Sequence, residues 1–217
     1  SQLTEVSPFL DTIKRLRLLI DRLRKQEINI RYLDLGGGLG ITYSEEAPPH
    51  PKEYAKALLA EVEGIDCTLI FEPGRVIVGN AGTLITRVLY TKEGPVKNFF
   101  VVDAGMNDLV RPSLYGSYHH IQPVVDHRRP QVTADVVGPI CETGDFIARD
   151  RSLPQVDPGE LLAVMSAGAY GFAMSSNYNS RPRPPEILVR DDKFQVIRSR
   201  ETYDDLLKGE LIPDFLG

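Results

Sequence analysis

The chain has 217 residues, with 25 lysines and arginines against 30 aspartates and glutamates, and its formal net charge is -5 at pH 7. This acidic balance argues against a nucleic acid or an anionic membrane surface as the main partner. Two cysteines are too few for a disulfide scaffold, and the first ten residues have neither the basic nor the apolar region of a secretory signal, so a globular, cytoplasmic protein is expected.

Residues 1–80 alternate between helical and strand-like patterns. Ser7 and Pro8 are typical of an N-cap and a first helical residue, and apolar residues then recur at helical spacing as far as Leu23. The pattern predicts a helix, a buried strand, a second helix and a second apolar strand over residues 8–23, 30–35, 54–62 and 67–71. This alternation indicates βα units on a parallel sheet. Two strands are too few to close a β/α barrel, so the segment is expected to be part of a larger one.

The pattern changes near residue 80, and residues 81–217 are expected to form an antiparallel β-sandwich or barrel domain. Short β-rich runs separated by turns predict strands over residues 83–90, 97–102, 131–136 and 160–166. A late hairpin is expected across residues 190–193, and a short helix is expected over residues 202–208.

Two glycine-containing segments follow the predicted strands of the first domain. Residues 36–38 are three glycines, whose backbone N–H groups can approach an anion closely; a tight loop without a ligand is the alternative. Residues 72–75 combine the carboxylate of Glu72 with the guanidinium of Arg75; an ordinary ion pair is the alternative. Because ligands in such sheets bind at the carboxyl ends of the strands, we expect both segments to face one site.

Three further motifs lie in the second domain. Arg111 precedes Tyr115 by four residues, and this pair can bind a carboxylate through a guanidinium fork and a phenol. Cys141 and Glu142 lie on a glycine-bounded turn, where the cysteine is either a small buried hydrophobic residue or an acid–base group. Tyr170 lies among small residues, where packing is its simplest role. None of the four histidines has metal-ligand spacing, so no metal site is expected.

In this order, the motifs resemble the alanine-racemase-like, fold-type III pyridoxal-phosphate decarboxylases, which combine a TIM-like β/α barrel with a β domain. The resemblance is greatest to the branch that decarboxylates meso-diaminopimelate to L-lysine and carbon dioxide, and it extends from Ser1 to about Leu207. It implies that residues 1–80 are the C-terminal half of the cofactor-binding barrel and residues 81–217 the β domain. Five marks carry it: residues 36–40, 72–75, 111–115, 141–145, and 168–171 with the tail 176–184.

The resemblance implies pyridoxal 5'-phosphate as the cofactor and assigns a role to each motif. Glu72 would face the ring nitrogen and keep it protonated. The implied cofactor contacts are Gly38, Glu72, Pro73, Gly74, Arg75 and Tyr170. The implied substrate contacts are Arg75, Arg111, Tyr115, Glu142 and Tyr170, with Arg111 on the distal carboxylate and Glu142 on the distal amine. Cys141 would be the acid that protonates the carbon that has lost carbon dioxide.

A homodimer with shared active sites is also implied, because the residues that match Cys141 and Glu142 reach into the partner subunit's site in this family. The family's covalent cofactor lysine belongs to an early barrel strand, and none of the lysines here lies in such a motif. We therefore expect the isolated chain to be inactive. The alternative function is a non-catalytic binding or dimerisation module derived from such a decarboxylase. The joint presence of Arg111, Cys141 and Glu142 favours the enzyme.

Overall fold

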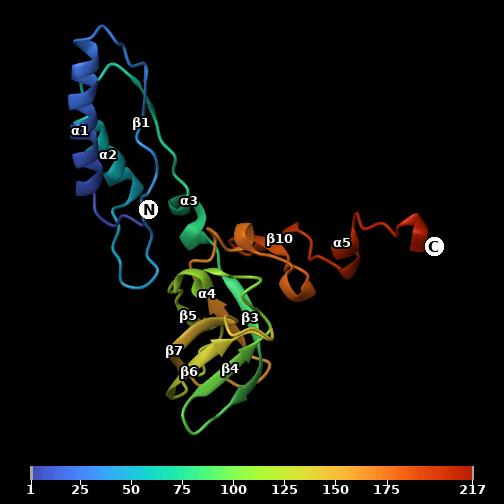
Figure 1. Ribbon diagram of the computed structural model, residues 1–217. Coiled ribbons are helices and arrows are strands. Elements are labelled where there is room, and N and C mark those ends of the chain that lie inside the picture. Colours follow the sequence, from blue (N-terminus) through green and yellow to red (C-terminus); the bar gives the residue numbers. More distant parts are fainter. Residues whose placement is uncertain (1, 217) are drawn as a thin grey trace. The chain divides into compact units, whose positions relative to one another are not determined.

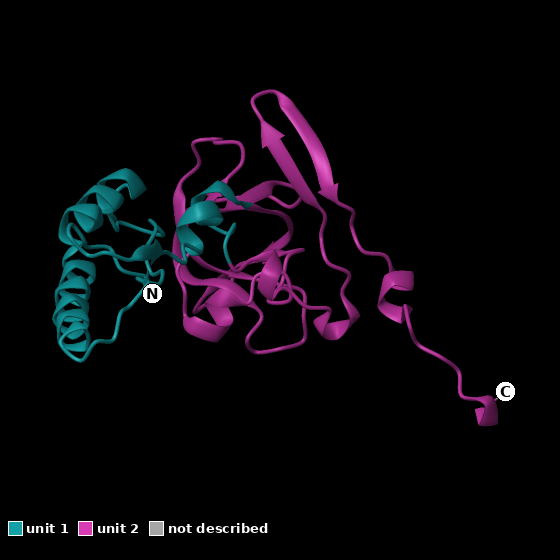
Figure 2. Ribbon diagram, turned by 90° about the horizontal axis from the view of Figure 1, so that it is seen from above, with its two compact units in different colours: residues 1–83, 165–169 teal, residues 84–164, 170–217 magenta. Residues whose placement is uncertain are grey.

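The computed structural model describes residues 2–216, which divide into two compact units (Figure 2). Unit 1 contains the residues up to Thr83 together with Met165–Ala169, and unit 2 contains Leu84–Val164 and the residues from Tyr170 onward. No helix within residues 2–216 is long and apolar enough to cross a membrane.

Unit 1 confirms the expected alternation of helices and strands (Figure 1). Its elements are α1 (Ser7–Arg24), β1 (Tyr32–Asp34), α2 (Pro51–Glu61), β2 (Thr68–Ile70), the short α3 (Arg75–Val78) and a 3-10 turn, η1 (Gly79–Ala81). The two strands pair in parallel, with Leu33 opposite Leu69. Parallel strands need a long crossover connection, and α2 lies within the one that joins these two.

The core of unit 1 lies between its two long helices. Phe9 and Ile13 of α1 pack with Leu58 of α2 and with Val62, which follows it. The ring of Phe9 meets Tyr54 edge-on, with the ring centroids 4.8 Å apart. These contacts bury part of the apolar stripe that the sequence displayed at helical spacing, whereas Leu19 of the same stripe is 50% exposed.

Two expectations for unit 1 are wrong. Ser7 is not the N-cap of the first helix: it lies inside α1, the N-cap is Val6, and the Ser7 hydroxyl donates to Glu5 at 3.3 Å. The two strands are also shorter than expected, and the first is buried on one face only, since Tyr32 is 66% exposed while Leu33 is 6% exposed. Successive strand side chains point to opposite faces, and only the face that carries Leu33 and Leu69 is packed.

Unit 2 is built on one six-stranded sheet, which confirms the expectation of a β-rich fold in its coarse form. The strand order is β5–β8–β3–β4–β6–β7, with bounds Ile121–Pro123, Leu161–Val164, Leu84–Lys92, Asn98–Val102, Gln131–Val137 and Phe146–Pro154. The edge strands β5 and β7 also contact each other, so the sheet is nearly closed into a barrel. Its interior is filled by fully buried aliphatic side chains such as Val88, Val102, Val136, Leu162 and Val164.

The expectation of a purely antiparallel domain is wrong at one pairing. Strands β4 and β6 run parallel, with Phe100 opposite Val136. Residues 103–130 between them include the short helix α4 (Arg111–Tyr115) and strand β5, so the connection is long enough to return the chain to the same end of the sheet.

The sequence patterns did not predict α4, β5 or β7. The sequence patterns missed strand β7 because Arg149, Asp150 and Arg151 interrupt its apolar pattern. The structure accommodates these charges at the surface or against polar partners: Arg149 and Asp150 are exposed, and Arg151 donates to the carbonyl oxygen of His119 at 2.7 Å.

The hairpin expected late in the chain is present as a separate two-stranded sheet. Strands β9 (Glu186–Arg190) and β10 (Lys193–Arg198) pair in antiparallel fashion. The short helix α5 (Tyr203–Leu207) follows, and the Thr202 side chain caps its N-terminus in a capping box with Asp205.

Candidate active site

The two glycine-containing segments of unit 1 lie side by side. Because β1 and β2 are parallel, their carboxyl ends meet at one edge of the sheet. The pairing continues past the ends of the strands. The Leu35 N–H donates to the carbonyl oxygen of Ile70 at 3.0 Å, and the Glu72 N–H donates to the carbonyl oxygen of Gly36 at 2.9 Å. The expected meeting of these two segments at one edge is therefore confirmed.

The glycines are required by the backbone at this edge. Gly36 and Gly38 have φ values of +66° and +107°, in the region that L side chains rarely adopt. A Cβ at Gly37 would overlap the carbonyl oxygen of Glu72. The three glycines thus allow the two segments to approach each other at van der Waals distance.

Several polar groups at this edge are available to a ligand. The N–H groups of Gly37, Gly38 and Gly74 donate no hydrogen bond to any of residues 2–216. Glu72, Pro73 and Gly74 are exposed. Backbone N–H groups at strand ends bind phosphate, and a carboxylate keeps a pyridine nitrogen protonated. The residues at this edge therefore fit pyridoxal phosphate.

Arg75 is held beside this edge by a residue that the sequence patterns did not single out. Its Nη1 donates to the hydroxyl of Tyr43 at 2.8 Å, and its guanidinium lies 5.5 Å from the centroid of the Tyr43 ring. Tyr43 is buried, so it holds the guanidinium end of Arg75 from a fixed position.

A second cluster, in unit 2, joins Arg111, Tyr115 and Tyr170. The Arg111 guanidinium lies 6.0 Å from the Tyr115 ring centroid and 5.4 Å from the Tyr170 ring centroid, and its Nη2 donates to Ser117 at 3.2 Å. Arg111 is only 7% exposed, whereas Tyr115 is 63% exposed. Tyr170 has φ of +63°, an unfavourable value for tyrosine, which indicates that its surroundings hold it there.

A third cluster lies on the turn that carries Cys141 and Glu142. Both residues are exposed, so the interpretation of Cys141 as a small buried hydrophobic residue is wrong. Glu142 accepts a hydrogen bond at each carboxylate oxygen, from the Gly144 N–H at 3.2 Å and from the Tyr178 hydroxyl at 3.2 Å. The hydrogen bond to Glu142 raises the pKa of the Tyr178 phenol above its ordinary value.

The buried carboxylate of Asp145 stabilises the turn that carries Cys141 and Glu142. Asp145 is 4% exposed, and it accepts the Met106 N–H at 2.7 Å on one oxygen and the Ile140 N–H at 2.6 Å on the other. Gly144 lies against α4, since a Cβ there would come 2.7 Å from the Ser113 hydroxyl. The Cys141–Glu142 turn and the helix that begins at Arg111 are therefore fixed to each other within unit 2.

The sequence patterns missed Asp145, Tyr178 and Tyr43 as site-supporting residues. Asp145 and Tyr178 lie inside the motifs that carried the family resemblance, but neither had a role assigned. Met106, Glu142 and Arg75, which these residues contact, lie 39, 36 and 32 residues away in the sequence, so local spacing holds no signal for these contacts.

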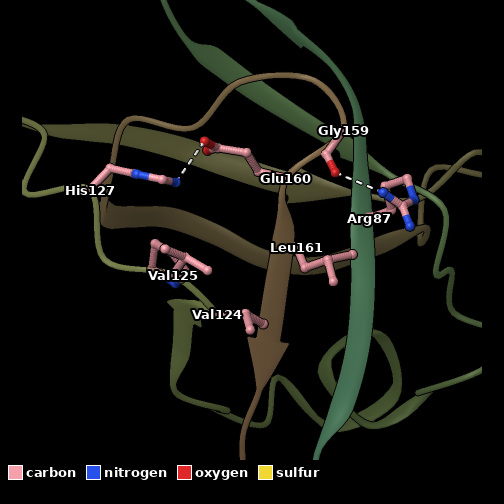
Figure 3. A pocket seen from close by; sticks show the side chains of 8 residues that line it. Arg87, Val124, Val125, His127, Gly159, Glu160 and Leu161 are labelled. Atoms are coloured by element: carbon pink, nitrogen blue, oxygen red, sulfur yellow. Dashed lines mark hydrogen bonds and ion pairs between the residues drawn. The ribbon is translucent and has the colours of Figure 1, made fainter.

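An open pocket elsewhere in unit 2 contains none of the predicted site residues (Figure 3). Its volume is about 230 Å³, and its polar groups are engaged with one another: His127 lies 3.3 Å from Glu160, and Arg87 donates to the Gly159 carbonyl oxygen at 2.8 Å (Figure 3). The rest of its lining is apolar, including Val124 and Val125. We therefore do not assign the chemistry to it.

Comparison with known proteins confirms the resemblance inferred from the motifs. Residues 17–168 match the family described as "Pyridoxal-dependent decarboxylase, C-terminal sheet domain". Diaminopimelate decarboxylase of Pseudomonas aeruginosa is 53% identical over 98% of this chain and 51% of that protein. The diaminopimelate decarboxylase of Aquifex aeolicus is 50% identical over 97% of this chain and 50% of that protein. The chain spans about half the length of the curated relatives it matches.

Solved structures of diaminopimelate decarboxylases are also similar to this chain. Diaminopimelate decarboxylase from M. jannaschii in co-complex with L-lysine has a TM-score of 0.93 and 38% sequence identity, over 100% of this chain and 51% of that chain. The Helicobacter pylori enzyme complexed with L-lysine has a TM-score of 0.87 and 41% identity, over 96% of this chain and 52% of that chain.

Proposed function

Because the chain belongs to the pyridoxal-dependent decarboxylases and contains their C-terminal sheet domain, we propose that it forms part of an enzyme that converts meso-diaminopimelate to L-lysine and carbon dioxide. The observation that carries the proposal is the edge of unit 1 where Gly37, Gly38 and Gly74 leave their N–H groups without acceptors among residues 2–216, next to the exposed Glu72. The diaminopimelate decarboxylases that share about half of its residues over nearly its whole length support the choice of substrate.

The proposal assigns different roles to the two parts of the sequence. Residues 1–80 would be the C-terminal half of the cofactor-binding β/α barrel, and residues 81–217 would be the β domain. The parallel pairing of β1 with β2 and the βα order of unit 1 support the first part. The remaining barrel strands, and the lysine that binds the cofactor covalently, would be supplied from outside this sequence.

At the glycine edge, Gly38, Gly74 and Arg75 would hold the cofactor phosphate, with Pro73 fixing the backbone between Glu72 and Gly74. When bound, pyridoxal phosphate supplies an electron sink for the electron pair that remains when carbon dioxide leaves. Glu72 would maintain that capacity by keeping the ring nitrogen protonated, since a carboxylate beside a cationic group favours the charged form. Tyr170 would contact both cofactor and substrate.

The β domain would recognise the far end of the substrate. Meso-diaminopimelate carries a carboxylate and an ammonium group at its distal carbon. Arg111 offers a planar fork for the carboxylate, Tyr115 a phenol beside it, and Glu142 a negative charge for the ammonium. Arg75 would be a further substrate contact. Cys141 would transfer its thiol proton to the carbon that has lost carbon dioxide and would be left as a thiolate.

The direct test is an assay of the full-length protein that contains this sequence, with added pyridoxal phosphate. We expect release of carbon dioxide and L-lysine from meso-diaminopimelate and much slower turnover of ornithine, which lacks the distal carboxylate that Arg111 would bind. The 217-residue chain by itself should be inactive. Turnover of ornithine in preference to meso-diaminopimelate would overturn the substrate assignment.

The proposal includes a homodimer in which Cys141 and Glu142 complete the partner subunit's site. Mixing a Cys141→Ala protein with one that lacks the covalent lysine tests this arrangement. A mixed dimer can contain one site with both defects and one with neither, so activity should return, to at most about half of wild type by the symmetry of two sites. No recovery, with subunit exchange verified by mass, would mean that Cys141 serves its own chain.

The second candidate is a non-catalytic binding or dimerisation module, which would use the six-stranded sheet that forms a compact unit of its own. The same assay separates the two, because a module would neither bind pyridoxal phosphate nor turn over any amino acid when the rest of the barrel is supplied.

A further inference from the structure

Glu142 is held in an unusual way for an exposed carboxylate. One oxygen accepts the N–H of Gly144, which lies two residues along the same turn, and the other accepts the hydroxyl of Tyr178, which comes from a distant part of the chain. Without the second bond, the carboxylate would be tied only within its own turn, and the side chain would retain much of its rotational freedom.

The segment that carries Tyr178 is itself anchored. The Ser176 N–H donates to the carbonyl oxygen of Asn107 at 2.9 Å, and Arg181 Nε donates to the Asn107 side-chain oxygen at 3.0 Å. Asn107 is 1% exposed, so the two ends of the segment are fastened to a buried residue. Asn177, next to Tyr178, donates to Glu201 at 2.6 Å. The phenol is therefore presented from a fixed backbone.

We propose that Tyr178 is a positioning residue that sets the orientation of the Glu142 carboxylate and thereby makes the site selective for substrates with a distal ammonium group. The inference rests on the proposed function, in which Glu142 binds that ammonium. Tyr178 acts through Glu142: it occupies one carboxylate oxygen and leaves the other lone pairs of a fixed carboxylate for the ligand.

A tyrosine suits this role because its hydroxyl is a neutral donor. A lysine or arginine in its place would neutralise the carboxylate and weaken its attraction for an ammonium group. The pKa of Tyr178 is raised by its hydrogen bond to Glu142, so the phenol keeps its proton, and remains a donor, at neutral pH.

The test compares two ligands that differ only in the distal ammonium. L-lysine retains the distal carboxylate and ammonium of meso-diaminopimelate as its α-carboxylate and α-ammonium, and 6-aminohexanoate has the same carbon chain, carboxylate and terminal amine without the α-ammonium. In the full-length holoenzyme, Tyr178→Phe keeps the ring but removes the donor. We expect lysine affinity to fall about tenfold, as for a lost hydrogen bond to a charged group, while 6-aminohexanoate affinity changes less than about twofold. The KM for meso-diaminopimelate should rise more than kcat falls.

A double-mutant cycle decides whether Tyr178 acts through Glu142. Glu142→Gln removes the charge, and in that background Tyr178→Phe should have no further effect on lysine affinity. Glu142→Asp provides a second route, because the shortened side chain retracts from the phenol: it should weaken lysine binding with Tyr178 present, and Tyr178→Phe should add little to it. This second series also decides the question if Tyr178→Phe alone folds poorly.

Equal loss of lysine and 6-aminohexanoate affinity, or additive effects of Tyr178→Phe and Glu142→Gln, would overturn the positioning role, because either result describes a residue that supports the pocket as a whole. These outcomes are separable from failure of the proposed function. If the wild-type protein neither turns over meso-diaminopimelate nor binds lysine, both proposals fail; if it does both and Tyr178→Phe leaves lysine affinity unchanged, only the role of Tyr178 fails.

Discussion

The glycine edge of unit 1 and the Cys141–Glu142 turn of unit 2 are built in opposite ways. At the glycine edge, three backbone N–H groups have no acceptor among the described residues and the Glu72 carboxylate is exposed. At the turn, both oxygens of Asp145 accept backbone N–H groups, and both oxygens of Glu142 accept hydrogen bonds.

The difference teaches what each region needs from a ligand. At the glycine edge the N–H groups have no acceptor among the described residues, so they can donate hydrogen bonds to an anion that binds there. A turn whose polar groups are already satisfied holds its side chains in place beforehand, which suits residues that must meet a substrate in one orientation. The predictions below test this contrast between an open receptor and a prearranged turn.

The largest expected effect is at Asp145, which supports the prearranged turn. Asparagine has one carbonyl oxygen, so Asp145→Asn leaves either the Met106 or the Ile140 N–H facing an amide nitrogen. Leaving such a buried donor unsatisfied should cost roughly 3 kcal/mol, measured by urea unfolding. The alkylation rate of the exposed Cys141 thiol should change as well, because the turn loses its support.

Asp135→Asn is the matched control for Asp145→Asn. Asp135 is also a buried carboxylate of unit 2, at 6% exposure, and it accepts the Asp150 N–H at 2.6 Å and Lys97 at 3.0 Å. It should lower stability without altering the alkylation rate of Cys141. Equal changes in alkylation rate for the two variants would show that Asp145 has no special relation to the turn.

The next effect concerns Glu72 at the open edge. Glu72→Gln keeps the size of the side chain but removes the charge that would hold the cofactor ring nitrogen protonated. In the full-length enzyme we expect turnover to fall at least about 100-fold, the scale seen when one electrostatic contact to a reacting centre is lost, with cofactor binding still measurable. Glu45→Gln, which removes another exposed carboxylate of unit 1, should leave turnover unchanged. Normal turnover of the Glu72 variant would remove Glu72 from the site.

A smaller effect distinguishes two neighbouring glycines of the same edge. Gly36→Ala meets no atom within 4 Å, so only its φ of +66° opposes it, at about 1 kcal/mol. Gly37→Ala would overlap the Glu72 carbonyl oxygen and push the two segments apart, at roughly 2 kcal/mol. In the full-length protein, affinity for pyridoxal phosphate should therefore drop further for Gly37→Ala. The reverse order would mean that the approach of the two segments is irrelevant to binding.

Much of this architecture was predictable from sequence, because its signals are local. Helical spacing predicted α1 and α2, and glycine motifs after strands predicted the edge that β1 and β2 form. The parallel pairing of β4 with β6 was not predictable in this way, since it depends on where the chain returns after residues 103–130. Strand β7 was missed because its charged residues obscure the apolar alternation.

The candidate site shows the same difference between local sequence motifs and long-range contacts. Gly38, Glu72 and Arg111 belong to motifs that carry the family resemblance, so roles could be proposed for them in advance. Asp145 and Tyr178 act through hydrogen bonds to Met106 and Glu142, 39 and 36 residues away in the sequence. A sequence pattern records residue types at fixed spacing, and it carries no information on contacts that only the folded backbone creates.

The smallest predicted effect tests how firmly the tail that carries Tyr178 is held. Glu201 accepts hydrogen bonds from the Arg183 N–H at 2.8 Å, from Arg183 Nη1 at 3.1 Å and from Asn177 at 2.6 Å. The bond from the Arg183 backbone is the main cause that lowers the pKa of Glu201 below its ordinary value.

A lowered folded-state pKa means that this stabilisation is fully present above the unfolded pKa and is lost as the pH falls through the folded one. Glu201→Gln should cost at most about 1 kcal/mol at pH 7, because the group is partly exposed. Its difference from wild type in urea unfolding should shrink as the pH falls below about 4. Glu210→Gln, at an exposed carboxylate farther along the chain, should show no such pH-dependent difference. If the Glu201 difference stayed constant between pH 7 and pH 3, the carboxylate charge would have no part in holding the tail, and Tyr178 would depend on Asn107 alone for its fixed position.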